Sequence, residues 1–227
     1  MDAFIFDMDG VIVDSELHWK QVEGFFLQSL VPTWGRADQD RIIGLSVHDL
    51  YRMLVDEYGV THSKDDFLDL YHGMARTIYG EKASLIPGFT GLLAALNKDG
   101  VPVALASSSP RPWIEIVLDR FRLRDSFQAV VSSDEVQGEG KPSPAIYLRT
   151  ARKLGVAPER CVVIEDSRNG VLSARNAGMY CIGFRNGFND EQDLSAANMV
   201  VNGFGELEYE KLHTLLDDRQ WTMDDAD

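Results

Sequence analysis

Short, continuous runs of hydrophobic residues recur along the chain, and each has about the length of a β-strand. They lie at residues 3–6, 101–106, 129–132, 161–165, 180–184 and 199–201. Most of these runs do not alternate with polar residues. They therefore predict strands that are buried on both faces of a parallel sheet.

Helical patterns separate many of these runs. Amphipathic stretches cover residues 89–99, 113–121, 144–154 and 171–177. Gly100, Gly155 and Gly178 follow three of them, as is common where a helix ends. Alternating strands and helices predict an α/β fold with a doubly wound, Rossmann-like parallel sheet.

One segment breaks the alternation. Residues 15–84 contain no convincing strand pattern, but they show helical patterns at 17–30, 38–43, 47–58 and 63–79. Four such helices are enough for a small bundle. The sequence therefore predicts a Rossmann-like core of residues 1–14 and 85–227, with a four-helix cap domain of residues 15–84 inserted after the first strand. Two hinge strands should connect them.

The net charge of the chain argues against some classes of binding partner. It has 22 Lys and Arg against 36 Asp and Glu, a formal net charge of −14. Nucleic acids and anionic membranes attract cationic surfaces, so neither is an expected partner. A small phosphorylated metabolite still fits an acidic protein if a metal ion and a few cations meet in one cleft. Part of the acidity falls in residues 221–227, which we expect to fray.

The cysteines and the first residues indicate the compartment. Cys161 and Cys181 lie far apart in hydrophobic runs, which is typical of reduced thiols in a cytosolic protein. The chain starts with neither a basic region nor a long apolar stretch, and no later run is long enough to span a membrane. We expect a cytoplasmic protein, and a monomer by default.

Two acidic residues follow the first predicted strand. Asp7 and Asp9 come directly after the run at 3–6, and Gly10 permits a sharp turn. Two carboxylates at the end of a buried strand are costly unless a cation or hydrogen bonds compensate them. One can attack phosphorus, while the other protonates the leaving oxygen and then activates water. By itself, however, this pair is equally typical of a capped turn.

Polar residues also follow later strands, at the edge where open α/β sheets bind ligands. Ser107, Ser108 and Ser109 offer hydroxyl and backbone N–H groups that suit a phosphate, with Ser107 and Ser108 as the candidate phosphate contacts. Lys141 offers a cation before a helix, and Glu165 and Asp166 offer hard oxygen ligands for Mg²⁺. Each feature alone is also explained by a helix cap or a solvent-exposed loop. Together they predict a site for phosphoryl transfer.

Four stretches carry a family resemblance: FDMDGVIVDSE, ASSS, GKPSP and IEDSRNG. In this order they resemble the four motifs of the haloacid dehalogenase superfamily. Over residues 1–201 the chain is similar to the β-phosphoglucomutase-like and sugar-phosphatase branch, in which a helical cap lies between the first two motifs.

The resemblance implies a role for each matching residue. Asp7 would be the nucleophile and Asp9 the general acid and base, and Ser107 and Lys141 would contact the phosphate. The implied ligands of Mg²⁺ are a carboxylate oxygen of Asp7, the backbone carbonyl of Asp9, and Asp166, with Glu165 at or next to the metal.

The resemblance leaves several activities to weigh. Dehalogenases of this type lack the second acid, so Asp9 argues against carbon–halogen chemistry. Phosphonatases use a cap lysine, and the lysines of the predicted cap stand in no matching motif. β-Phosphoglucomutases grip a second phosphate with a cap arginine after a Gly-Val-Ser turn. The matching turn here starts at Gly44, and Val47 takes the place of that arginine.

Two arginines keep the mutase alternative open. Arg52 lies one helical turn beyond Val47 and can substitute for the missing cation in principle. Arg111 stands where the mutase has an asparagine, and it is either a phosphate contact or a residue of the helix surface. The cap-side candidates for substrate recognition are His18, Val47, His48 and Arg52.

We therefore predict a Mg²⁺-dependent phosphatase that hydrolyses a small phosphorylated metabolite, above all a sugar phosphate, through an aspartyl-phosphate. One alternative is a phosphosugar mutase of the β-phosphoglucomutase type. Another is a non-catalytic binding module on the same fold, which would be expected to have lost some of the motif residues. The cap should open for substrate and close to exclude water.

Overall fold

The structure is a computed structural model, and it describes residues 2–42, 45–136 and 139–207. Three features of the sequence fall outside the described residues. These are the acidic segment 221–227, the last residue of the helix predicted at 38–43, and Gly44 in the turn compared with the mutases.

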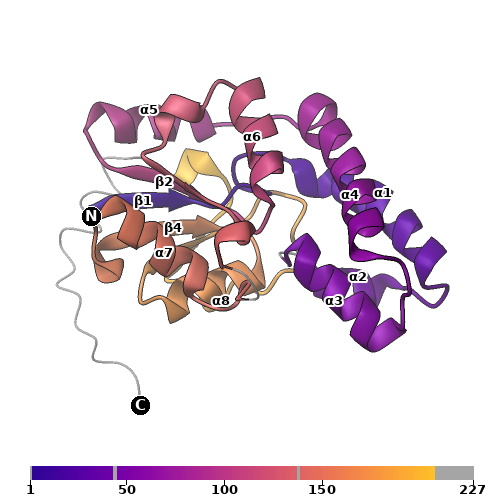
Figure 1. Cartoon of the computed structure of the whole chain (residues 1–227). Helices are drawn as coiled ribbons and strands as arrows, with labels where there is room; N and C mark the ends of the chain where they lie inside the picture. The colour runs from indigo at the N-terminus through magenta and orange to yellow at the C-terminus, as the bar shows by residue number, and fades with distance from the viewer. Residues whose placement is uncertain (1, 43–44, 137–138, 208–227) are drawn as a thin grey trace, which may run out of the picture.

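A parallel sheet of six strands lies at the centre of the described fold (Figure 1). The strands are β1 (Ala3–Phe6), β2 (Val103–Ala106), β3 (Ala129–Val131), β4 (Cys161–Glu165), β5 (Tyr180–Phe184) and β6 (Met199–Val201). They lie in the order β3-β2-β1-β4-β5-β6, which is an order of doubly wound sheets. In register, Ile5 of β1 pairs with Ala104 on one side and Val163 on the other. The predicted fold class is confirmed.

Helices cover both faces of the sheet. Successive side chains of a strand point to opposite faces, so a strand of hydrophobic residues presents an apolar surface on each side. Phe4 and Phe6 of β1 belong to a hydrophobic cluster with α5 and α6, whereas Ala3 and Ile5 belong to one with α7 and α8. All four side chains are fully buried, which explains the continuous hydrophobic run. These helices are α5 (Phe89–Lys98), α6 (Arg111–Arg120), α7 (Ala145–Leu154) and α8 (Arg168–Asn176).

Between β1 and α5 the described chain forms four α-helices and then a π-helix. These are α1 (Ser15–Leu30), α2 (Arg36–Ile42), α3 (Val47–Tyr58), α4 (Lys64–Thr77) and the π-helix η1 (Ile78–Lys82). The single helix predicted over 63–79 thus changes geometry at Ile78, which hydrophobic periodicity does not reveal. We call residues 15–84 the cap segment. That they form a domain of their own stays a prediction.

Two short segments connect the cap segment to the sheet, and they form isolated β-bridges rather than full strands. Val13 forms an antiparallel bridge with Leu85. The backbone N–H of Asp14 donates to the carbonyl of Ser84 (3.1 Å), and the backbone N–H of Ser84 donates to the Asp14 carboxylate (2.6 Å). The chain therefore leaves and re-enters the sheet at one place. The cap segment lies beside the carboxyl ends of the strands (Figure 1).

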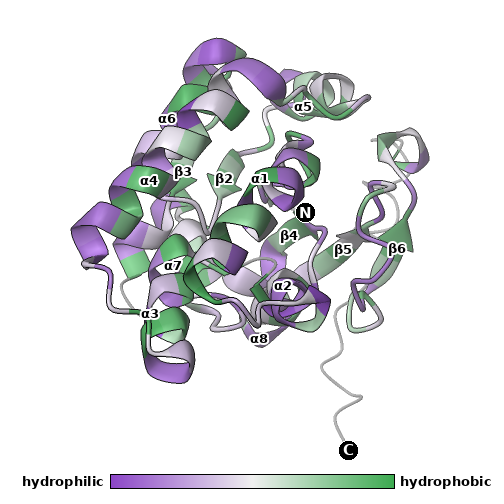
Figure 2. Ribbon diagram, turned by 90° about the vertical axis from the view of Figure 1, so that its right-hand side faces the viewer, coloured by the Kyte–Doolittle hydropathy of each residue, from purple (hydrophilic) through white to green (hydrophobic). Residues whose placement is uncertain are grey.

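Hydropathy follows this architecture, since hydrophobic residues dominate the strands and the helices carry both kinds (Figure 2). No helix in the described ranges is both long and apolar enough to cross a membrane. Short 3₁₀-helices occupy connections of the described chain: η2 (Arg124–Ser126), η3 (Ser133–Val136), η4 (Pro158–Arg160) and η5 (Phe204–Glu206).

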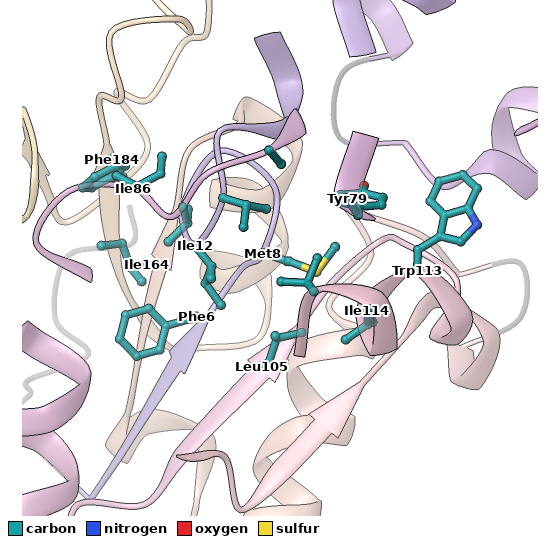
Figure 3. Close-up of a cluster of buried hydrophobic side chains, with 14 of the residues drawn as sticks. Phe6, Met8, Ile12, Tyr79, Ile86, Leu105, Trp113, Ile114, Ile164 and Phe184 are labelled. Atoms are coloured by element: carbon teal, nitrogen blue, oxygen red, sulfur yellow. The ribbon is translucent and has the colours of Figure 1, made fainter. Parts of the chain in front are cut away.

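Phe6 provides a test of this packing (Figure 3). Its ring lies 5.3 Å from that of Phe89 and 6.5 Å from that of Phe127, between centroids. We expect Phe6→Ala to lower the free energy of unfolding by about 3–5 kcal/mol in urea titrations, because it leaves a cavity. Phe25→Ala is the control, since Phe25 is 79% exposed and should change this free energy by less than about 0.5 kcal/mol. Equal losses would contradict the packing described.

Candidate active site

Two neighbouring strands bring the two acidic motifs together. β1 and β4 lie side by side and run parallel, so the residues that follow them meet at one edge of the sheet. The backbone N–H of Asp7 donates to the carbonyl of Ile164 at 3.1 Å. Asp7 therefore lies beside Glu165 and Asp166, which are about 160 residues away in sequence.

Lys141 is buried between two carboxylates. Its Nζ lies 2.5 Å from Oδ1 of Asp7 and 2.5 Å from Oε1 of Glu165. The hydroxyl of Tyr147 donates to the same Glu165 oxygen. Burial by itself lowers the pKa of the Lys141 ammonium, but the charges of Asp7 and Glu165 more than offset this and raise that pKa above its ordinary value. The lysine therefore stays charged.

Three carboxylates meet next to this lysine. Asp7, Glu165 and Asp166 are buried, and each offers an oxygen within 4.8 Å of the others. Burial raises the pKa of Asp7 well above its usual range despite the attraction of Lys141. Burial, and then the charge of Asp7, raises the pKa of Asp166 in the same way. One ammonium does not balance three carboxylates, and hard oxygen ligands suit Mg²⁺, so this group fits a divalent cation.

Gly10 leaves the room that this group needs. It has a positive φ of 76°, and a Cβ at this position would overlap the carboxylate of Asp166. Asn186 then donates from Nδ2 to the carbonyl of Gly10 and to Oδ2 of Asp166, each at 2.9 Å. Sequence reasoning missed Asn186. Its only signal is its position just after the strand at 180–184.

Asp9 has a different environment, composed of hydroxyl groups. Oδ1 accepts from Ser15 (2.5 Å) and Tyr79 (2.7 Å), and Oδ2 accepts from Ser109 at 2.9 Å. The Ser107 hydroxyl lies 3.5 Å from Oδ2 and accepts from the backbone N–H of Ser109. The sequence analysis placed Ser107 and Ser109 at the site as part of a serine run, but it did not predict that Ser15 and Tyr79 contact Asp9. Contact between the Asp9 carbonyl and a metal stays a prediction.

A cavity between the cap segment and the sheet is lined by both Asp7 and Asp9. Val47 from the predicted cap residues borders it, and so does Ser108 from the predicted phosphate contacts. The other residues that line it include Asp7, Asp9, Glu16, Trp19, Lys20, Glu23, Gln39, Tyr71, Tyr79, Ser109, Trp113, Lys141 and Asp166.

Aromatic rings form one wall of this cavity. Trp19 stacks on Tyr71 at 5.7 Å and on Trp113 at 5.3 Å between centroids. Its Nε1 donates to the Tyr79 hydroxyl at 3.1 Å. Tyr79 and Trp113 lie together on one side of Met8 (Figure 3). Trp19 therefore both packs within the cap segment and borders the cavity.

Acidic residues of α1 lie on the cap side of the cavity. Glu23 accepts from Tyr71 (2.9 Å) and from Gln39 (2.8 Å). Burial raises the pKa of Glu23 to about 7, against the effect of these two hydrogen bonds. Burial, and then the charge of Asp9, raises the pKa of Glu16 to about 8. Sequence reasoning missed Glu16, Glu23 and Gln39 because helical periodicity does not tell which polar residues border a cavity.

The structure places two predicted arginines outside this cavity. Arg111 donates to Glu115 (2.5 Å) and to the carbonyl of Val130 (3.1 Å), and it borders a different cavity. Arg52 lies 3.3 Å from Asp49 and borders a third cavity. Neither arginine is among the described residues that line the cavity of Asp7, and their roles in phosphate binding stay predictions.

The two predicted histidines also lie elsewhere. His48 shares the cavity of Arg52, with Nε2 at 3.5 Å from Asp134. His18 lies 4.0 Å from Asp14, next to the connection between cap segment and sheet. Neither is among the described residues that line the cavity of Asp7.

Comparison with known proteins identifies the family. Residues 1–178 match the haloacid dehalogenase-like hydrolases. The chain is 36% identical over 186 residues to hexitol phosphatase B of Escherichia coli (strain K12). The aligned region covers 79% of this chain and 82% of that protein. It is 30% identical over 221 residues to a β-phosphoglucomutase of Bacillus subtilis (strain 168), and the aligned region covers 94% of each protein.

A solved structure has the same fold. The crystal structure of a β-phosphoglucomutase from Clostridium difficile superposes with a TM-score of 0.78 at 24% identity, over 96% of this chain and 98% of that one. The family match over residues 1–178 and the 36% identical relative show that the chain belongs to the haloacid dehalogenase-like hydrolases. Its predicted place in the β-phosphoglucomutase-like and sugar-phosphatase branch is confirmed, and so is the prediction of an enzyme of the phosphatase type.

The hydroxyl of Tyr79 should position Asp9. Tyr79→Phe removes one of the hydrogen bonds that hold the Asp9 carboxyl group, so we expect kcat for p-nitrophenyl phosphate to fall roughly threefold to thirtyfold. KM should stay within about twofold, because the substrate contacts remain. Tyr58→Phe is the control, since that hydroxyl donates to Asp38 within the cap segment. Equal kcat values in both variants would show that Tyr79 does not position Asp9.

Proposed function

We propose that this hydrolase is a Mg²⁺-dependent phosphatase that cleaves a small phosphorylated metabolite, a sugar or sugar-alcohol phosphate, through an aspartyl-phosphate on Asp7. The observation that carries the proposal is the contrast between two carboxylates in one cavity. Asp7 lies among charged groups, whereas Asp9 lies among hydroxyls. The hexitol phosphatase relative supports the class of substrate.

The first step transfers the phosphoryl group to Asp7. A carboxylate oxygen of Asp7 forms a bond to phosphorus while the bond from phosphorus to the substrate oxygen breaks. Asp9, in its protonated form, gives its proton to that oxygen, so the substrate leaves as an alcohol. Lys141 stays beside Asp7 at 2.5 Å and stabilises the negative charge that gathers on the phosphoryl oxygens. Ser107 and Ser108 are the proposed phosphate contacts at the end of β2.

The second step returns the enzyme to its starting state. Asp9, now a carboxylate, takes a proton from water, and the water oxygen attacks phosphorus as the bond to Asp7 breaks. Inorganic phosphate leaves, and both aspartates regain their initial forms. The hydroxyls of Ser15, Tyr79 and Ser109 hold the Asp9 carboxylate in one orientation for both proton transfers.

Asp7, Glu165 and Asp166 would hold Mg²⁺, together with the backbone carbonyl of Asp9. When bound, the ion neutralises phosphoryl oxygens and compensates the carboxylates around it. Lys141 already pairs with two of these carboxylates. The expected absence of nucleic acid and membrane partners, the monomeric state and the cytoplasmic location stay predictions.

Replacing Asp7 tests the covalent step. Asp7→Asn keeps the shape of the side chain but removes the nucleophile, so we expect phosphate release from sorbitol 6-phosphate to fall by at least about a thousandfold. Asp56→Asn, an exposed residue of the cap segment, should release phosphate at the wild-type rate. EDTA should abolish the activity and excess Mg²⁺ restore it. Full turnover by the Asp7→Asn enzyme would exclude the aspartyl-phosphate.

The mutase alternative is favoured by the β-phosphoglucomutase relative, which aligns with nearly the whole chain. A mutase has to hold a second phosphate on the cap side. In this structure the cap-side residue Val47 is apolar and buried, and Arg52 borders another cavity. The side chains that line the cavity therefore favour transfer of the phosphoryl group to water rather than to a second substrate hydroxyl.

Product analysis separates these two activities. With β-glucose 1-phosphate and Mg²⁺, a phosphatase forms glucose and inorganic phosphate in equal amounts. Glucose 6-phosphate should stay below about a hundredth of the product, measured by coupled glucose 6-phosphate oxidation. Accumulation of glucose 6-phosphate without phosphate release would instead assign the mutase activity.

A further inference from the structure

Glu23 and Gln39 form a hydrogen-bonded pair on the cap side of the cavity. Oε2 of Glu23 accepts from Gln39 Nε2 at 2.8 Å, and its Oε1 accepts from the Tyr71 hydroxyl at 2.9 Å. Oε1 of Gln39 accepts from Trp34 Nε1 at 3.0 Å. Side chains from α1, α2 and α4 thus hold this carboxylate in place. We call Glu23 and Gln39 the distal pair.

The distal pair retains hydrogen-bonding capacity toward the cavity. A carboxylate can accept about four hydrogen bonds, and the described residues supply two to Glu23. The amide of Gln39 has a second N–H besides the one that it gives to Glu23. The pair therefore offers both acceptors and a donor. Hydroxyl groups, which donate and accept, match this set.

A continuous wall connects the distal pair to the reacting groups. From Asp9 it runs through the Tyr79 hydroxyl to Trp19, whose ring stacks on Tyr71, and the Tyr71 hydroxyl donates to Glu23. Asp9 and Glu23 thus lie at two ends of one aromatic wall in the same cavity. A phosphate at Asp7 would place the other end of an extended substrate near Glu23.

The charges at this end disfavour a second phosphate. Among the described residues that line the cavity, the cations are Lys20 and Lys141. Lys141 is engaged by Asp7 and Glu165, and Lys20 lies 2.5 Å from Glu191. A second phosphate would instead meet acidic side chains. Binding it there would cost the repulsion between like charges.

The aromatic rings also disfavour an alkylammonium group. Such cations bind over the open faces of aromatic rings. Trp19 instead packs against both Tyr71 and Trp113, and these two rings are stacked on each other at 6.5 Å between centroids. The three rings therefore pack against one another rather than around an open site for a cation.

We propose that the distal pair is a subsite for the hydroxyl groups of an uncharged polyhydroxy chain, which makes the substrate a monophosphorylated sugar alcohol or sugar. This inference rests on the proposed function, because it takes the phosphate to lie at Asp7. Glu23 accepts hydrogen bonds from the substrate hydroxyls, and Gln39 orients Glu23 and donates to a substrate oxygen.

Binding measurements test the subsite without turnover. In the Asp7→Asn background with Mg²⁺, titration calorimetry compares sorbitol 6-phosphate with butyl phosphate, which has no free hydroxyl groups. We expect sorbitol 6-phosphate to bind at least about tenfold more tightly. Glu23→Ala should weaken its binding roughly tenfold to a hundredfold while changing butyl phosphate binding by less than about twofold. Glu57→Ala is the matched control, because Glu57 is an exposed cap residue paired with Arg41.

Other binding results would contradict the proposal that the distal pair is a hydroxyl subsite. Equal binding of the two esters, or equal loss of both in Glu23→Ala, would show that the distal pair does not read hydroxyl groups. Tighter binding of phosphoethanolamine or glucose 1,6-bisphosphate than of sorbitol 6-phosphate would assign the site to a cation or to a second phosphate. Gln39→Ala serves as a second variant if Glu23→Ala does not fold, with a loss of at least about threefold for sorbitol 6-phosphate alone.

Turnover separates this inference from the proposed function. Selective binding without phosphate release by the wild-type enzyme would retain the subsite and exclude the phosphatase. Phosphate release from both esters at equal kcat/KM would retain the phosphatase and exclude the subsite.

Discussion

The site depends on the burial of one charged lysine between two carboxylates. Lys141 bridges Asp7 after β1 and Glu165 at the end of β4, and thereby connects the loop before α7 to the centre of the sheet. Desolvating these charges is costly, and their attraction offsets the cost only because all of them are present at short range. Among the described residues, Asp166 has no ammonium partner, and this imbalance of charge is why the three carboxylates suit a divalent cation.

The order of the strands places these paired groups together at the ligand-binding edge of the sheet. Because β1 and β4 are neighbours, two acidic motifs far apart in sequence meet at the carboxyl edge of the sheet. The cap segment then covers that edge and adds Ser15 and Tyr79 to the surroundings of Asp9. Two aspartates two residues apart thus occupy different environments, which is how proteins separate a nucleophile from an acid and base.

The cap segment decides what can occupy the rest of the cavity. Its inner side is acidic and aromatic, with Glu23 held by Tyr71 and Gln39, and Val47, at the position predicted to match the mutase arginine, is apolar and buried. Arg52 is close in sequence but turned toward Asp49 and another cavity. Under the proposed function, the distinction between hydrolysis and mutase activity would depend on which side chains of α1 to α4 face inward, and less on the motifs that the two activities share.

The sequence by itself determined the strands, the doubly wound sheet and the residues at the strand ends, because these are local patterns: continuous apolar runs, and polar residues directly after them. It also determined the family, since four motifs occur in order. Only the tertiary structure decided that Tyr79, Ser109 and Asn186 contact the acidic groups, that Glu23 and Gln39 border the cavity, and that Arg111 does not. These contacts depend on how each helix is rotated against its neighbours and on the change to π geometry at Ile78, and neither property is encoded in the spacing of hydrophobic residues.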